Sequence, residues 1–168
     1  MMKQKKTFRL VAVVVAAMAL VTCKPDIEGE LGTHPERLGA LNGEWKISAF
    51  SQLDLNNPVQ EERDLSEFFI VEGETPLTIQ FNSSDLSYTV VPGPGKNYFG
   101  NGGTWGFDNA DYPSYLFLYG DDTLRFNLGS IVKPTDSNMV LALPRNCDDG
   151  AGNVLETVIY NFEFERAN

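Results

Sequence analysis

Apolar and polar residues alternate in short segments along most of the chain. In "LTIQF", Leu77, Ile79 and Phe81 share one face, with Thr78 and Gln80 on the other. Successive side chains of a β-strand point to opposite faces, so this period of two predicts strands with one buried face. Eight such segments, separated by Gly, Pro, Asn and Asp, lie at about 44–50, 76–82, 86–91, 103–107, 114–119, 123–129, 138–143 and 157–166. Short strands at this spacing are typical of an all-β sandwich or barrel.

Two of the eight segments are apolar on both faces, "YLFLY" at 115–119 and "MVLAL" at 139–143. A strand without a polar face is typical of one that is covered on both sides. We therefore expect these two to be covered on both sides or packed against another element.

The longest connection between predicted strands runs from residue 54 to residue 74. Asp64 or Ser66 could cap a short helix there that carries Phe68 and Phe69. An insertion of this kind closes one end of a barrel or forms a mobile binding loop. A second short helical piece, at residues 35–41, is expected to lead into the first strand.

The N-terminus has the pattern of a signal peptide. Four basic residues precede an uncharged apolar run at residues 10–21. That run is shorter than the roughly 20 apolar residues that a membrane-spanning helix needs. A charged segment followed by a short apolar one predicts export and processing.

The apolar run ends at "LVTC", which resembles the lipobox of bacterial lipoproteins, with Thr22 where Gly, Ala or Ser is usual. The resemblance implies that residues 1–22 are removed and that Cys23 is lipidated. Several acyl chains on one cysteine give stable membrane anchoring. The alternative is an ordinary signal peptide cut near Ala19, which leaves Cys23 as a free thiol or a disulfide partner of Cys147.

Residues 23–35 are acidic and contain Gly and Pro, which predicts a tether between the lipid and a domain at residues 36–168. The tract "KPDIEGE" resembles the one after the lipidated cysteine of surface-exported lipoproteins of Bacteroidota. Lys24 is not the aspartate associated with inner-membrane retention. We expect an outer-membrane protein, on the periplasmic face or the cell surface.

The charge of the mature chain limits its partners. From Cys23 onward it carries nine basic and 23 acidic residues, a net charge of −14. Such a charge argues against nucleic acid and against electrostatic binding to anionic lipid. The membrane is expected as a partner through the anchor at Cys23.

The sequence offers little for catalysis or metal binding. The single histidine, His34, lies at the tether boundary, and neighbouring aspartates should raise the pKa of Cys147. One histidine and one unlipidated cysteine do not make a zinc site. The acidic turns at 108–111, 120–122 and 147–150 lack EF-hand spacing. We expect no enzyme activity, no metal and no cofactor.

The segment "LNGEWKISAF", with Gly43 and Trp45 opening the first strand, resembles the Gly-x-Trp start of lipocalin-like barrels. With "LTIQFN", a Gly-Thr-Trp strand at 103–105 and a closing "VIYNFEFER", the chain is similar to the lipocalin-like domain lipoproteins of Bacteroidota over residues 38–166. The resemblance implies an antiparallel up-and-down eight-stranded barrel with a short helical insertion after the first strand. In such a barrel the Trp plugs the closed end and the Gly lets the backbone turn past it.

Two functions remain open for such a barrel. An eight-stranded barrel can hold one small ligand or be filled by its own side chains. A cavity would make the protein a binding module for a small apolar or amphipathic ligand, with Trp45, Tyr88, Trp105 and Phe126 among the lining residues. A filled barrel would instead be a scaffold whose loops contact an envelope protein or a polysaccharide. The aromatic pair Tyr98 and Phe99, on the Gly-rich loop "VPGPGKNYFGNGGTW", is then the expected contact.

Overall fold

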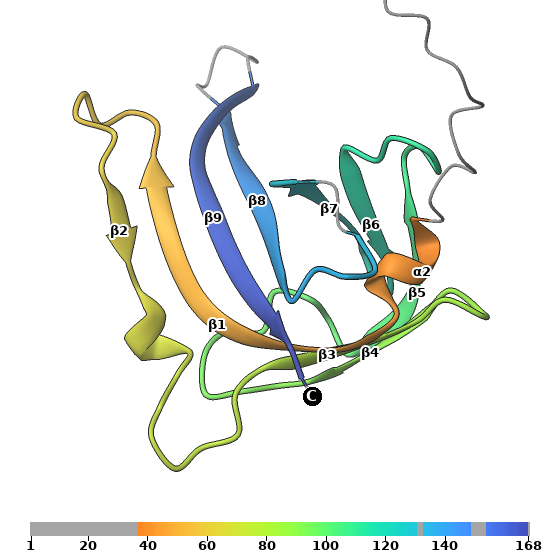
Figure 1. Cartoon of the computed structure of the whole chain (residues 1–168). Helices are drawn as coiled ribbons and strands as arrows, with labels where there is room; N and C mark the ends of the chain where they lie inside the picture. The colour runs from red at the N-terminus through yellow and green to blue at the C-terminus, as the bar shows by residue number, and fades with distance from the viewer. Residues whose placement is uncertain (1–36, 131–132, 149–153, 168) are drawn as a thin grey trace, which may run out of the picture. The chain divides into compact units, whose positions relative to one another are not determined.

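A computed structural model describes residues 37–130, 133–148 and 154–167 (Figure 1). The predicted signal peptide, the lipidation site at Cys23, the tether and His34 lie outside the described residues. What the sequence indicates for them stays a prediction.

Eight antiparallel strands form a closed up-and-down barrel, as the sequence predicted. Each of these strands pairs with the barrel strand that follows it in the chain, and the pairing of the first, β1, with the last, β9, closes the barrel. The barrel strands are β1 (Gly43–Asp54), β3 (Thr78–Asn82), β4 (Ser87–Val91), β5 (Gly102–Phe107), β6 (Tyr115–Tyr119), β7 (Thr123–Leu128), β8 (Asn138–Asp148) and β9 (Val154–Arg166). A short further strand that the sequence did not predict, β2 (Glu62–Asp64), pairs with the last part of β1.

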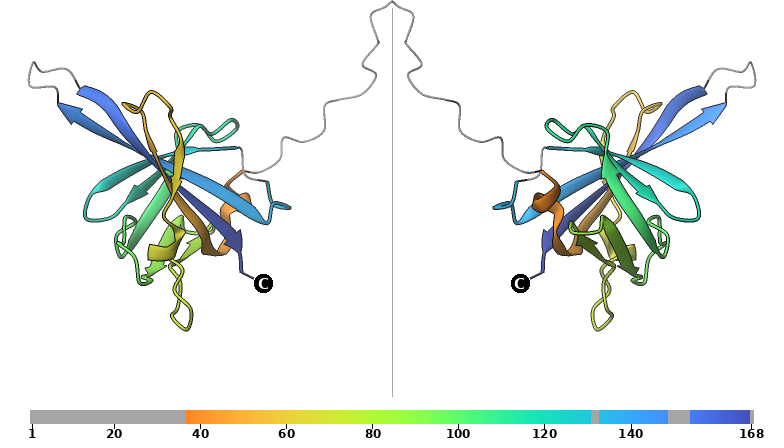
Figure 2. Two further views of the ribbon diagram at one scale, coloured as in Figure 1. Left: turned by 90° about the vertical axis from the view of Figure 1, so that its left-hand side faces the viewer. Right: turned by 90° about the vertical axis from the view of Figure 1, so that its right-hand side faces the viewer.

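The strands β8 and β9 are longer than predicted and extend beyond the rest of the barrel (Figure 2). The apolar alternation of β8 ends at Leu143, but pairing with β9 continues from Pro144 opposite Ile159 to Asp148 opposite Val154. The sequence pattern therefore predicted the buried part of β8 and missed the mainly polar residues that complete the strand.

The predicted alternation is confirmed in the burial of the strands. In β3, Ile79 and Phe81 are fully buried while Gln80 between them is exposed. Burying a large apolar side chain contributes roughly 1.5–3 kcal/mol each. The inward side chains that form the core in this way are Trp45, Ile47, Phe50, Ile79, Phe81, Tyr88, Trp105, Leu116, Leu118, Phe126, Met139, Leu141, Leu143, Phe162 and Phe164.

The expectation for "YLFLY" was wrong in one respect. Leu116 and Leu118 point inward and are buried, but the opposite face of β6 is not covered: Tyr119 is 45% exposed, and Tyr115 and Phe117 are half-buried. Phe117 and Tyr119 stack on each other on that outer face, with 6.1 Å between ring centroids. Aromatic residues on the outer face of a strand can shield one another without a second layer.

Both helical pieces are shorter than expected. The first is α2 (Leu38–Leu41), and the insertion contains a single 3₁₀ turn, η1 (Ser66–Phe68). The Ser66 hydroxyl accepts a hydrogen bond from the Phe50 amide at 3.0 Å, which ties the turn to β1. Among the residues described, no helix is both long enough and apolar enough to cross a bilayer.

One end of the barrel is capped by α2, and we call it the capped end. Trp45 lies there with no exposed surface, and its indole N–H donates to the Leu41 carbonyl at 2.8 Å. The Arg166 guanidinium covers the Trp45 ring at 4.3 Å and donates to the carbonyls of Asn42 and Ala40 at 2.6 and 2.8 Å. Trp45 thus plugs this end, as the Gly-x-Trp pattern predicted.

The glycine of that pattern is required by its backbone. Gly43 has a φ of +118°, which L side chains rarely adopt, and an added Cβ would lie 3.1 Å from Arg166 Nη1. The opposite end of the barrel is formed by the segment 65–77, the loop 92–101 and the turn 120–122, and we call it the mouth.

Candidate functional site

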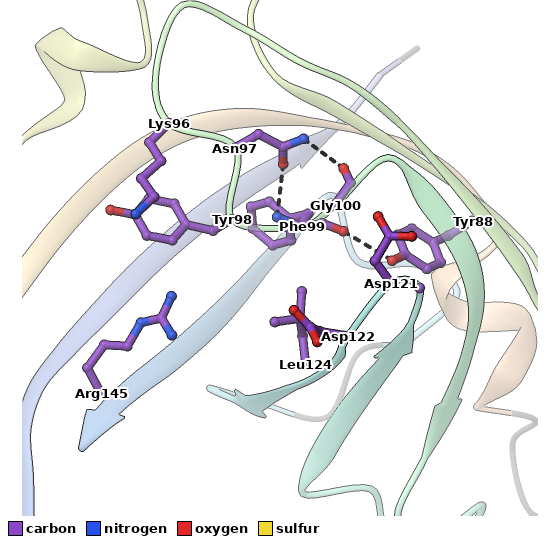
Figure 3. Close-up of a pocket in the computed structure, with 11 residues that line it drawn as sticks. Tyr88, Lys96, Asn97, Tyr98, Phe99, Gly100, Asp121, Asp122, Leu124 and Arg145 are labelled. Atoms are coloured by element: carbon purple, nitrogen blue, oxygen red, sulfur yellow. Dashed lines mark hydrogen bonds between the residues drawn. The ribbon is translucent and has the colours of Figure 1, made fainter. Parts of the chain in front are cut away.

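A pocket of about 230 Å³ opens at the mouth (Figure 3). It lies between three segments that are distant in the sequence: the loop 92–101, the turn between β6 and β7, and β8. Its lining residues are Tyr88, Lys96, Asn97, Tyr98, Phe99, Gly100, Gly120, Asp121, Asp122, Leu124 and Arg145.

Asn97 folds the loop that forms one wall of the pocket. Its side-chain oxygen accepts from the Phe99 amide at 2.9 Å, and its side-chain amide donates to the Gly100 carbonyl at 2.7 Å (Figure 3). Asparagine commonly replaces backbone hydrogen bonds in turns in this way. Gly100 follows with a φ of +73°, which a residue with a Cβ would resist. The loop thereby turns Phe99 into the barrel and keeps Tyr98 at the pocket.

Phe99 is a plug in the barrel, although it comes from a loop. It has no exposed surface, and its ring stacks on Phe126 at 5.0 Å and meets Phe162 and Phe164 edge-on at 4.9 and 5.6 Å. The Tyr88 hydroxyl donates to the Phe99 carbonyl at 3.1 Å and holds the plug in place. The sequence placed Phe99 among the outward loop contacts, whereas the structure places it in the core.

Tyr98, the other predicted loop contact, stays at the mouth. Its ring lies over the aromatic core, 5.4 Å from both Tyr160 and Phe162. Two cations lie against it: Lys96 Nζ at 5.0 Å and the Arg145 guanidinium at 5.8 Å from its centroid. Burial and then Tyr160 raise the pKa of Tyr98, which Arg145 partly opposes. The phenol is therefore neutral at physiological pH, and its hydroxyl can donate or accept a hydrogen bond at the wall of the pocket.

The turn between β6 and β7 supplies the acidic side of the pocket. Asp121 and Asp122 are exposed there, and both line the pocket together with Leu124 (Figure 3). Burial and then the charge of Asp121 raise the pKa of Tyr88. This turn was expected to be solvated, and its carboxylates also face a pocket.

A second hollow of about 390 Å³ lies beside the first. Its lining is mostly apolar and consists of Phe50, Phe68, Phe69, Pro94, Gly95, Lys96 and Tyr98. Phe69 packs on Phe50 with 4.3 Å between centroids, and Phe68 is 57% exposed at the rim. Lys96 and Tyr98 border both hollows, so the two share a wall: four charged side chains line the first hollow, whereas Lys96 is the one charged residue in the lining of the second.

The four residues predicted to line an interior ligand site are packed against protein. Tyr88 and Trp105 are 2% exposed, and Trp45 and Phe126 have no exposed surface. Trp45 is bonded to Leu41 and Tyr88 to Phe99. Phe126 stacks on Phe99, as described above. This packing favours the filled barrel of the two possibilities that the sequence left open.

Trp105 differs from Trp45 in one respect. Its ring meets Phe81 edge-on at 5.6 Å, but its indole N–H has no hydrogen-bond partner among the described residues. An unpaired buried donor weakens the fold by about 1–3 kcal/mol.

The other features weighed in the sequence have structural explanations. Asp108 accepts from the amides of Ser114 and Tyr115, both at 2.9 Å, and the bond from Tyr115 lowers the pKa of Asp108. The Cys147 thiol is exposed, and Thr157 donates to it at 3.4 Å. Within the described part of the chain, no three His, Cys, Asp or Glu residues cluster in a way that could hold a metal ion.

No protein-family model matches the chain, and no curated protein matches it significantly. The lipocalin-like resemblance therefore stays a prediction, and the geometry of the mouth is the structural observation that bears on function.

Proposed function

We propose that this chain is a non-enzymatic, outer-membrane lipoprotein anchored through Cys23, and that it binds a small amphipathic ligand at the mouth of its barrel. The anchor and the location rest on the N-terminal sequence pattern, and the face of the membrane remains open between periplasm and cell surface. The binding role rests on the mouth.

One observation carries the binding role: a hollow lined by four charged side chains and a mainly apolar hollow share the wall made by Tyr98 and Lys96. Ligand sites combine apolar surface with a few placed polar groups. An amphipathic molecule would place its apolar part against Phe68 and Phe69 and its polar part beside Arg145. Of the four core residues that the sequence suggested, Tyr88 borders the mouth pocket, and Trp45, Trp105 and Phe126 lie in the packed interior away from the proposed site.

Native mass spectrometry of the full chain in detergent, after incubation with an extract of its host's envelope, tests this proposal. We expect a discrete added mass of a small molecule that is lost in Tyr98→Ala. Tyr119→Ala removes an exposed tyrosine on the outer face of β6 and is the matched control, which should keep the mass. A mass that persists in Tyr98→Ala, or its absence from the wild-type chain, would contradict a ligand site at the mouth.

A second candidate is the scaffold whose loops contact an envelope protein or polysaccharide. It is favoured by three apolar side chains on one segment of the mouth: Phe68, Ile70 and Val71 are 57%, 42% and 39% exposed. The double variant Phe68→Ser with Val71→Ser should then lose a partner that the wild-type chain captures. Val91→Ser, at a 52% exposed position on β4, is the control. Equal capture by all three proteins would remove this candidate.

A further inference from the structure

Four charged side chains line the mouth pocket, and they come from three separate segments. Lys96 lies on the loop 92–101, Asp121 and Asp122 on the turn after β6, and Arg145 on β8. All four residues are exposed. Within the described ranges, no ion pair joins any two of them. Their charges are directed at solvent in the pocket.

The positively and the negatively charged side chains lie on different sides of the pocket. Lys96 and Arg145 both lie against Tyr98, at 5.0 and 5.8 Å from its ring centroid. Asp121 and Asp122 lie on the opposite side, near Tyr88 and Leu124 (Figure 3). The pocket is therefore dipolar, with a positive side at Tyr98 and a negative side at the β6–β7 turn.

A dipolar pocket selects for a ligand that carries both charges. A charge-assisted hydrogen bond is roughly twice as strong as a neutral one. A ligand with one charge would use one side of the pocket and place its neutral end against the other pair of charges. A zwitterion can use both sides at once.

The size of the pocket limits the zwitterion to a small molecule. Its volume of about 230 Å³ equals roughly eight water molecules at the liquid share of about 30 Å³ each. An amino acid, a dipeptide or a lipid headgroup is of this order. The apolar hollow across Tyr98 can take an aromatic or aliphatic side group.

We propose that the mouth pocket binds a small zwitterion, with the anionic group at Lys96 and Arg145 and the ammonium group at Asp121 and Asp122. This inference rests on the proposed function, because it specifies the ligand of the same site. A free amino acid or short peptide and a zwitterionic phospholipid headgroup share this chemistry, and the test distinguishes them.

Calorimetric titration of the full chain in detergent tests the inference with four probes. Glycylphenylalanine carries both charges, its N-acetyl derivative lacks the cation, and its amide lacks the anion. O-phosphoethanolamine represents the lipid headgroup. We expect either glycylphenylalanine or O-phosphoethanolamine to bind. If the dipeptide binds, its N-acetyl derivative and its amide should each bind at least tenfold more weakly than the dipeptide itself. For a headgroup ligand, ethanolamine and methyl phosphate replace the two derivatives as single-charge probes.

Two double variants assign the sides of the pocket. Lys96→Gln with Arg145→Gln should weaken binding of the zwitterion at least tenfold. In this variant the zwitterion should bind no more tightly than the probe that lacks the anion. In the variant Asp121→Asn with Asp122→Asn, the zwitterion should instead bind no more tightly than the probe that lacks the cation. This exchange of selectivity is one that a merely structural role would not produce. Lys46→Gln and Glu163→Gln, at exposed positions on β1 and β9, each remove one charge of the corresponding sign away from the pocket and are the controls.

Three outcomes would overturn the inference: equal binding of zwitterion and single-charge probes, unchanged selectivity in both double variants, or no binding of any zwitterion. The mass-spectrometric experiment with Tyr98→Ala is independent of these probes. An added mass there, together with any of the three outcomes, would retain the proposed binding role and discard the zwitterion.

Discussion

The two ends of the barrel place an arginine beside an aromatic ring in opposite ways. At the capped end, Arg166 covers Trp45 at 4.3 Å and donates to three backbone carbonyls, those of Ala40, Asn42 and Asp136. At the mouth, Arg145 lies 5.8 Å from Tyr98, and no hydrogen bond joins its guanidinium to another described residue. A guanidinium whose donors are used by the backbone stabilises the fold, whereas one with free donors can serve a ligand. This contrast indicates that the capped end stabilises the barrel, and it supports the proposal that the mouth is the functional end.

Removal of the plug at the capped end should have the largest effect on stability. Trp45→Ala deletes a fully buried indole, its hydrogen bond to Leu41 and the ring under Arg166. We expect a loss of about 4–5 kcal/mol in the free energy of unfolding, measured by urea denaturation. A loss below about 1 kcal/mol would show that Trp45 is not essential to the fold.

Removing the plug of the mouth should cost less. Phe99→Ala leaves a cavity between Phe126, Phe162 and Phe164, but the loop that carries it can partly collapse into the space. We expect destabilisation of about 3 kcal/mol in the same assay. Destabilisation greater than that of Trp45→Ala would reverse the proposed roles of the two ends.

The backbone of the capped end offers a third test. Gly43→Ala places a Cβ at a φ of +118° and 3.1 Å from Arg166 Nη1. We expect a loss of about 1–2 kcal/mol, because an unusual backbone conformation and a displaced guanidinium both oppose folding. Gly73→Ala, where φ is +85° with no heavy atom within 4 Å, separates the two causes and should cost less. Equal losses would indicate that the contact with Arg166 contributes nothing.

The smallest effect concerns the mouth at alkaline pH. Burial raises the pKa of Tyr98 above the value of about 10 that tyrosine has in an unfolded chain. Its contribution to stability is thus fully present below pH 10 and is lost as the pH rises through the folded pKa. Denaturation at pH 8 and pH 11 should show a smaller alkaline loss for Tyr98→Phe than for the wild-type chain. An identical loss would mean that Tyr98 ionises equally well in the folded state.

The parts that could be predicted from the sequence are those that depend on neighbouring residues. All eight barrel strands could be located, six from the period-two pattern and the segments 115–119 and 139–143 as short apolar runs, because the inward face of each strand must be apolar. Gly43 and Trp45 were also assigned correctly, since the pattern of a glycine two residues before a plug lies within one strand. In these cases the residues that determine the feature lie close together in the chain.

The mouth could not be predicted in the same way. Phe99 is on a loop, and loops usually lie on the surface, so its burial depends on a gap between strands that the local sequence does not show. Arg145 lies beyond the apolar end of its strand and reaches the pocket because β8 continues to Asp148. Lys96, Asp122 and Arg145 are far apart in the chain, and only the closed barrel brings them to one pocket.

The most direct test of the division between the two ends is the free energy of unfolding of Arg166→Gln beside that of Arg145→Gln, measured by urea denaturation of the full chain. We predict that Arg166→Gln loses about 2 kcal/mol or more, because three backbone carbonyls and the Trp45 face lose their partner. Arg145→Gln should change stability by less than about 0.5 kcal/mol, as an exposed side chain outside the packed core. Equal losses, or a larger loss for Arg145→Gln, would contradict the assignment of the mouth as the functional end.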